Sequence, residues 1–142
     1  MTDVFDALEA LRDVLDNGIA DLTAVVGPVD NVTAAPAAAV VEVADGDFLN
    51  YQVVMGDGQI DAQLTITVFV QATNLDGARA LIRPYMADTG DSSVFALVRA
   101  DPTLGGAVTD AAVLTAGSLG RYSLGDTERR YLGVVFSVAV ML

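Results

Sequence analysis

The chain contains no cysteine, no histidine, no tryptophan and no lysine among its 142 residues. Without cysteine it can form no disulfide, no thiolate zinc site and no cysteine nucleophile. Without histidine it lacks the most frequent general base and transition-metal ligand, which excludes a Ser-His-Asp or Cys-His mechanism. These absences favour a structural protein over an enzyme, and we expect no cofactor.

Positive charge is scarce as well. Seven arginines stand against nineteen acids, which gives a formal net charge of −12. Such a surface repels phosphates, and tight nucleic-acid binding depends on cationic contacts. We therefore expect neither specific DNA binding nor attachment to an anionic membrane.

Long hydrophobic runs are also missing. The chain does not open with the basic and then apolar segment of a signal peptide. Its longest charge-free apolar stretch, 131–142, has about half of the ~20 residues that a membrane-spanning helix needs. We expect a protein that stays in the cytoplasm or is assembled there into something larger.

Hydrophobic residues make up 53% of the chain, which is enough for the core of one domain over residues 1–142. We expect an α+β fold: a mixed, mainly antiparallel sheet flanked by an N-terminal helix and two central helices. Apolar residues at three- and four-residue spacing predict helices over 3–22, 74–87 and 93–100. Thr2 and Asn74 are the expected caps of the first two helices, and Pro84 should kink or shorten the second.

Alternating apolar residues predict the strands. The expected strands are 37–44, 48–55, 60–72, 107–115 and 130–142, with a short strand around Tyr122 in the turn-rich segment 119–125. Gly56-Asp57-Gly58 predicts a hairpin between the second and third strands. The last strand is apolar on both faces, which is typical of a strand in the middle of a sheet that is covered on both sides.

Four acids gather around two glycine-containing turns: Asp45, Asp47, Asp57 and Asp61. Carboxylates could ligate Ca²⁺ or Mg²⁺ there, although the spacing of a calcium-binding loop is absent. Aspartate and glycine are also typical of ordinary turns. An acidic module that binds divalent metal ions therefore stays open as an alternative function.

Arg121, Arg129 and Arg130 place three of the seven positive charges within ten residues. They could pair locally with Asp126 and Glu128. They could also form bidentate hydrogen bonds to acids of a neighbouring subunit. Both interpretations stay open.

Residues 93–108 read Ser-Val-Phe-Ala-Leu-Val-Arg-Ala-Asp-Pro-Thr-Leu-Gly-Gly-Ala-Val. This stretch resembles the tail terminator (tail completion) proteins of long-tailed bacteriophages, in which a short helix runs into a Thr-Leu-Gly-Gly turn and then into a strand. The order of the other elements is similar too. It includes Pro-Ala-Ala-Ala-Val-Val at 36–41, Ala-Arg-Ala-Leu at 78–81 and Tyr-Leu-Gly-Val-Val-Phe-Ser-Val-Ala-Val at 131–140.

The resemblance implies a virion protein at the head-proximal end of the tail. Such a protein forms a ring, usually of six subunits, that caps the tail tube, stops its polymerisation and provides the interface for head-tail joining. Its partners would be copies of itself, the tail tube protein and a head-completion or neck protein, while DNA passes through an acidic lumen without specific binding.

The residues expected at the interface with a neighbouring subunit or the tube are Thr103, Leu104, Gly105, Gly106, Arg121, Arg129 and Arg130. The glycine pair allows a tight turn without a side chain in the way, which suits a subunit edge and equally an ordinary turn. A head-tail connector or neck protein is the alternative within the same class.

Overall fold

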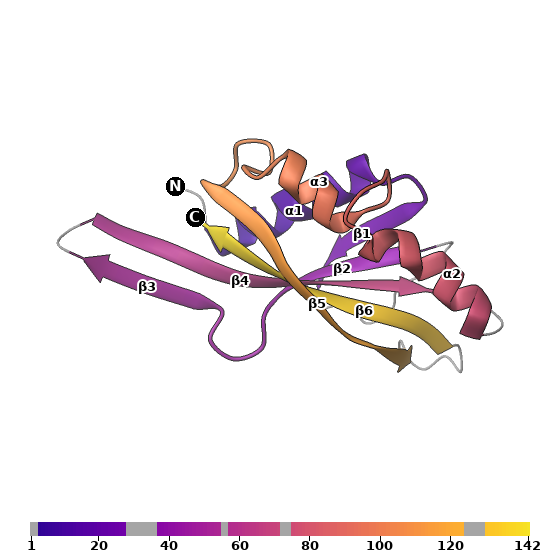
Figure 1. Cartoon of the computed structure of the whole chain (residues 1–142). Helices are drawn as coiled ribbons and strands as arrows, with labels where there is room; N and C mark the ends of the chain where they lie inside the picture. Colours follow the sequence, from indigo (N-terminus) through magenta and orange to yellow (C-terminus); the bar gives the residue numbers. More distant parts are fainter. Residues whose placement is uncertain (1–2, 28–36, 55–56, 72–74, 124–129) are drawn as a thin grey trace.

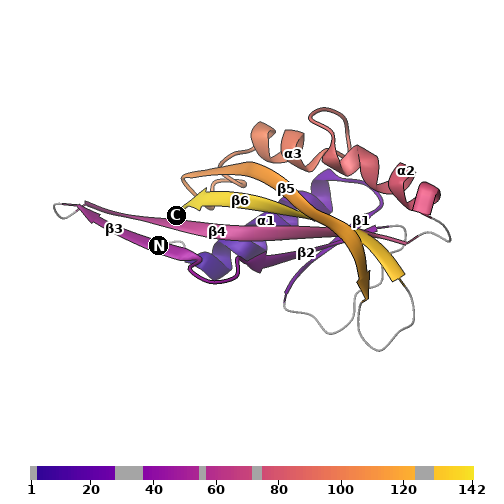
Figure 2. The same cartoon turned by 60° about the horizontal axis from the view of Figure 1, so that its bottom comes forward.

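The computed structural model describes residues 3–27, 37–54, 57–71, 75–123 and 130–142. Within them a six-stranded sheet carries three helices on one face (Figures 1 and 2). The elements are α1 Val4–Gly18, β1 Leu22–Val26, β2 Ala37–Val43, β3 Leu49–Val54, β4 Asp57–Val70, α2 Leu75–Met86, α3 Val94–Ala100, β5 Asp110–Ser123 and β6 Arg130–Met141. The expected α+β fold with a mixed, mainly antiparallel sheet is confirmed.

The sheet has the strand order β1-β2-β4-β6-β5, and β3 pairs with β4 outside this path. Only β1 and β2 run parallel; the other neighbours are antiparallel. β6 lies between β4 and β5, which confirms the central position expected for the last strand. β5 forms one edge of the sheet and β1 the other.

The expected hairpin between β3 and β4 is present and forms an arm. β6 pairs with β4 from Asp61 onwards, whereas β3 pairs with Asp57–Ala62. The first residues of β4 therefore have β3 as their strand partner, and this two-stranded ribbon projects beyond the body of the molecule in both views (Figures 1 and 2).

One core fills the space between the helices and the sheet. Leu11 and Leu15 of α1, Ile66 of β4, Val98 of α3 and Val134 of β6 are almost completely buried in it. Their burial follows from the helical and alternating spacing that the sequence displays, because each element places its apolar side chains on one face.

The opposite face of the sheet has a smaller apolar cluster. Ala38 and Val40 of β2 pack there with Phe69 and Tyr131, whose rings meet edge to face at 6.4 Å. From Val135 to the end of β6, the residues on this side are only half-buried. The prediction that the last strand is covered on both faces is thus met in full only on the helix side.

The first helix is shorter than predicted, and β1 was not predicted. α1 ends at Gly18, where the Ile19 N–H donates to the Leu15 carbonyl, and Asp21 turns the chain with a φ of 63°. Ile19 and Leu22 fit the helical spacing, but their burial comes from the turn and from β1. The β-branched residues of 22–26 favour a strand, and pairing with β2 decides the competition.

The N-cap of α1 is Asp3, whose carboxylate accepts a hydrogen bond from the Asp6 N–H at 2.9 Å. The Asp6 carboxylate in turn accepts from the Asp3 N–H, which completes a capping box. The prediction of Thr2 as the cap is wrong for this reason. Thr2 and Asn74, the expected cap of α2, both lie outside the described residues.

The bounds of the two later helices fit the prediction, but Pro84 does not end α2 early. α2 continues through Pro84 to Met86, with the proline in its last turn. α3 begins after Ser93, whose hydroxyl caps it. No helix in the described part of the chain is both long and apolar enough to cross a bilayer.

β5 is longer than predicted. Residues 119–123 continue the strand that was expected to stop at 115. Gly117 and Gly120 look like turn residues in the sequence, but they border an irregularity in the pairing with β6, where Ser118 has a φ of 53°. A bulge of this kind inserts extra residues without ending the strand.

Candidate assembly surfaces

The Thr-Leu-Gly-Gly segment forms a compact turn between α3 and β5. Leu104, Gly105 and Gly106 all have left-handed backbone angles, with φ values of 50°, 72° and 89°. The Asp101 carboxylate accepts from the Gly105 N–H at 3.0 Å, and the Thr103 hydroxyl accepts from the Gly106 N–H at 3.2 Å. Because its own side chains satisfy these amides, the turn holds its shape without an outside partner.

The turn offers backbone to the surface. Thr103, Gly105 and Gly106 are exposed, while Leu104 is buried at 3% and anchors the turn in the core. Leu104 and Gly105 also line a groove of about 600 Å³ against α1 and α3. Three of the four predicted interface residues in this turn are therefore accessible, and the fourth has a structural role.

Arg121 and Arg130 lie far from this turn. Arg121 stands in β5 opposite Leu132, Arg130 begins β6, and Arg129 lies outside the described residues, as do the side chains of all three. Asp110 pairs with Met141 and Arg121 with Leu132, and these nine residue steps of β6 separate the two predicted groups by roughly 30 Å, at about 3.3 Å per residue. The structure does not bring them together into one site.

Two of the aspartates considered as a metal site, Asp47 and Asp61, line one pocket of about 380 Å³. Asp45 and Asp47 are exposed in the β2–β3 connection, and Asp61 is half-buried on β4. The side chain of Asp57 lies outside the described part. Among the residues that the structure describes, no three carboxylates group closely enough to hold a metal ion.

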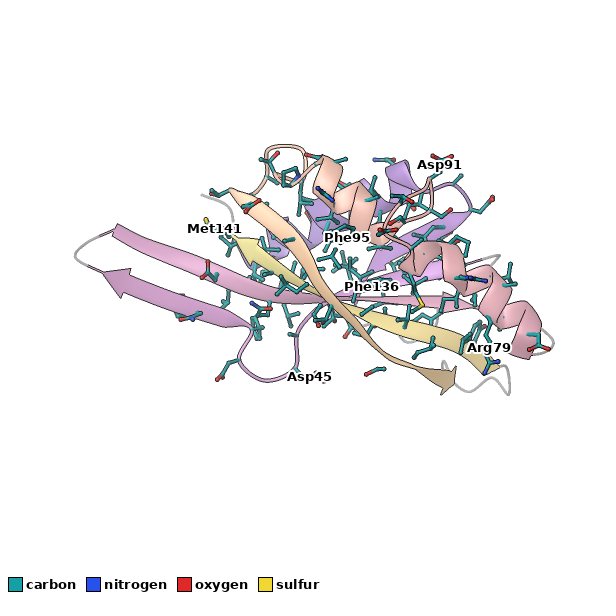
Figure 3. The ribbon with its side chains drawn as sticks, in the orientation of Figure 1. Asp45, Arg79, Asp91, Phe95, Phe136 and Met141 are labelled. Carbon is teal, nitrogen blue, oxygen red and sulfur yellow. The ribbon has the colours of Figure 1, made fainter. Side chains whose placement is uncertain are left out.

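An apolar groove that the sequence did not predict lies between α2, α3 and β5. It has a volume of about 240 Å³, and its lining residues are Met86, Ala87, Asp88, Phe95, Val113, Leu114, Thr115, Ala116 and Phe136. Phe95 and Phe136 lie in the layer between the helices and the sheet (Figure 3). Leu114 and Met86 at its rim are 59% and 40% exposed. Only one of the lining residues, Asp88, is charged.

Charge is distributed unevenly over the described side chains. Asp3, Asp6, Glu9, Asp13 and Asp16 are all exposed along α1. Arg12 of α1 pairs with Asp13 at 3.0 Å. The exposed arginines of the described part stand instead on α2 and α3: Arg79, which lies 3.9 Å from Asp76, Arg83, and Arg99 over the Phe95 ring.

Tyr85 of α2 is the described group with a shifted ionisation. Burial raises the pKa of its phenol above the ordinary value of 10.0, and the nearby Asp21 carboxylate adds to the rise. The phenol is therefore neutral at physiological pH. It is buried at 7% exposure, so it belongs to the packing of α2 against the sheet.

Comparison with protein-family models finds no match to this chain, and comparison with curated protein sequences finds none either. The functional argument therefore depends on the geometry and chemistry of the chain itself.

Proposed function

We propose that this chain is a structural assembly protein whose copies form a ring at the head-proximal end of a phage tail tube. There the ring stops tube polymerisation and offers the surface for head-tail joining. Its partners in this proposal are copies of itself, the tail tube protein and a head-completion or neck protein. The subunits assemble in the host cytoplasm and end in the virion, and they carry no enzymatic activity.

The observation that carries the proposal is the character of the edge strand β5. Residues 111–120 of this strand contain no charged side chain and no proline. Leu114 and Leu119 are 59% and 53% exposed. Proteins usually protect long sheet edges with lysine, proline or a covering segment, since unpaired backbone groups there attract another chain.

The two edges of the sheet differ, which favours a closed ring over a symmetric pair. β5 has 14 residues, whereas β1 at the opposite edge has five. A contact that joins unlike surfaces runs head to tail, and it closes into a ring when the rotation per subunit allows it.

The net charge of −12 fits a channel through which DNA passes without binding. Screening limits such repulsion to about 8 Å at physiological ionic strength, so only acids near the lumen contribute.

Electron microscopy of the purified protein, alone and with tail tube subunits, tests the proposal. Rings of the isolated chain, and tubes that carry a ring at one end and stop growing, are the expected results. Rings that leave tube growth unchanged would favour a connector or neck protein. A chain that remains monomeric with and without tube subunits would overturn the proposal.

A further inference from the structure

We infer that Phe5 of one copy inserts into the apolar groove between α2, α3 and β5 of the next copy, and that this is the contact that repeats around the assembly. The inference rests on the self-assembly proposed above and names the surfaces that carry it. It joins a projecting side chain at the start of α1 to a recess between α2, α3 and β5.

Phe5 is a rigid hydrophobic projection. Its neighbours Val4, Ala7 and Leu8 are buried against the sheet, whereas Phe5 is 69% exposed on the outward side of α1. The Asp3–Asp6 capping box fixes the first turn of the helix. An aromatic side chain held in this way loses little conformational entropy on binding, and its burial is worth about 1.5–3 kcal/mol.

The groove has the size and lining to receive a phenyl ring. Its volume of about 240 Å³ exceeds the roughly 150 Å³ of apolar cavities that accept benzene. Phe95 and Phe136 offer ring contacts inside, and the exposed side chains of Met86 and Leu114 stand at its rim. Thioether and aromatic groups of this kind are frequent anchors of protein interfaces.

The distribution of charge favours the α2–α3 region of the next copy as the site that receives Phe5. Asp3, Asp6 and Glu9 lie close to Phe5 in the chain and are exposed. Most of the acidic surface of a neighbouring copy would repel these three carboxylates. Arg83 stands one turn before Met86, and the Arg99 guanidinium lies 6.0 Å from the centre of the Phe95 ring. Acids that flank Phe5 can therefore meet arginines of the two helices that line the groove.

The two surfaces lie on different parts of the molecule. The N-terminal end of α1 lies toward the β3–β4 arm, whereas Phe95 and Phe136 of the groove lie near the middle of the molecule, on the side of α2 (Figures 1 and 3). One subunit therefore cannot satisfy its own groove, and each copy presents one projection and one recess. Repetition of such a contact produces a ring or an open helix.

The test uses the full chain with Phe5→Ala and Leu114→Asp, and with Tyr51→Ala as the matched control. Tyr51 is an aromatic residue of similar exposure, 66%, on the arm and away from both surfaces. Mass is measured by light scattering over a range of concentrations in physiological salt with millimolar Mg²⁺. We expect each of the first two variants to raise the concentration needed for assembly by about tenfold or more, and Tyr51→Ala to change it less than about twofold. Circular dichroism and the thermal midpoint of each variant show whether the fold is retained.

Mixing the two defective variants gives a sharper readout. The Phe5→Ala copy keeps an intact groove and the Leu114→Asp copy keeps an intact Phe5. An equimolar mixture should therefore form dimers through one native contact and should not form rings.

The outcomes separate the two proposals. If the wild type assembles and Phe5→Ala assembles equally well, the Phe5 contact is overturned, and the ring proposal is unaffected. Two folded variants that both fail to assemble, yet form no dimer when mixed, show that Phe5 and Leu114 do not meet each other, and this also overturns the contact. A wild type that stays monomeric at all concentrations overturns both.

Discussion

Ser93 is the buried polar side chain of the described core, with 1% of its surface exposed. Its hydroxyl accepts from the Ala96 N–H at 3.0 Å and donates to the Ala87 carbonyl. It thus caps α3 and ties it to the segment that follows α2. The hydroxyl acts as donor and as acceptor, so its removal leaves the Ala87 carbonyl and the Ala96 N–H without this partner.

We expect Ser93→Ala to lower the free energy of unfolding by about 1–2 kcal/mol. Chemical denaturation followed by circular dichroism measures the change. Ser92→Ala is the matched control, because Ser92 is next in the chain and is only partly buried, and it should cost less than about 0.5 kcal/mol. Equal effects of the two substitutions would show that the capping hydrogen bond contributes little.

At this scale the sequence predicts apolar spacing better than caps, since Asp3 and not Thr2 caps α1. Ser93 stands at the start of the expected helix 93–100, and serine suits the capping position. Phe5 also carried a signal, since it stands outside the apolar stripe of Val4, Leu8 and Leu11. The left-handed backbone of Leu104 had none, because it follows from the buried position of that leucine in the turn.

Among the elements, the Thr-Leu-Gly-Gly turn depends most on backbone conformation. Gly105 and Gly106 have φ values of 72° and 89°, and a Cβ at either position would meet nothing within 4 Å. Space is therefore no obstacle to a larger residue, and the backbone angle alone decides its effect.

We expect Gly105→Ala and Gly106→Ala each to lower the free energy of unfolding by about 1 kcal/mol, as alanine rarely adopts these angles. Thermal and urea unfolding measure the effect. Gly117→Ala is the control: the site in β5 is equally open but lacks a left-handed φ, so its stability should stay the same or rise slightly. A loss at Gly117 as large as that at Gly105 would contradict this explanation.

Element boundaries show where local pattern stops being sufficient. Ile19 and Leu22 match a helical spacing, yet Leu22 lies in a strand because it pairs with β2. In β5, Gly117 and Gly120 predict a turn, but the neighbouring β6 keeps the chain extended around the irregularity. In both cases a partner strand distant in sequence decided the structure, and no window of local residues contains that information.

At the scale of the whole molecule, charge is poorly balanced. Against a net charge of −12, the ion pairs Arg12–Asp13 and Arg79–Asp76 both join side chains at the surface. Exposed pairs contribute little to stability. We therefore expect repulsion among the acids to outweigh the attraction within the ion pairs.

We expect the thermal midpoint to rise by about 3–5 °C when NaCl is raised from low concentration to ~0.5 M, because screening reduces this repulsion. The measurement is made at a protein concentration where the chain is monomeric, so that assembly does not contribute. Asp45→Asn with Asp47→Asn should raise the low-salt midpoint and flatten the salt dependence, since both side chains are exposed. A midpoint that falls with NaCl would mean that attractive pairs dominate.

The fold class could be predicted at this scale because most elements carry their own period of apolar residues. The assembly surfaces could not. The groove exists only where Met86, Phe95 and Leu114, from three separate elements, come together in space. The exposure of β5 likewise depends on the strand order, which places it at an edge.

The β3–β4 arm gives a single strand two environments. From Ile66 to Val70, β4 lies between β2 and β6 and contributes to the core, whereas its first residues, from Asp57, have β3 as their strand partner. Isolated two-stranded ribbons are only marginally stable in water. The paired residues of β3 and the first part of β4 can therefore open locally and adapt to a contacting surface while the body of the sheet keeps its order. One continuous strand thus takes part in both an adaptable ribbon and a well-packed core.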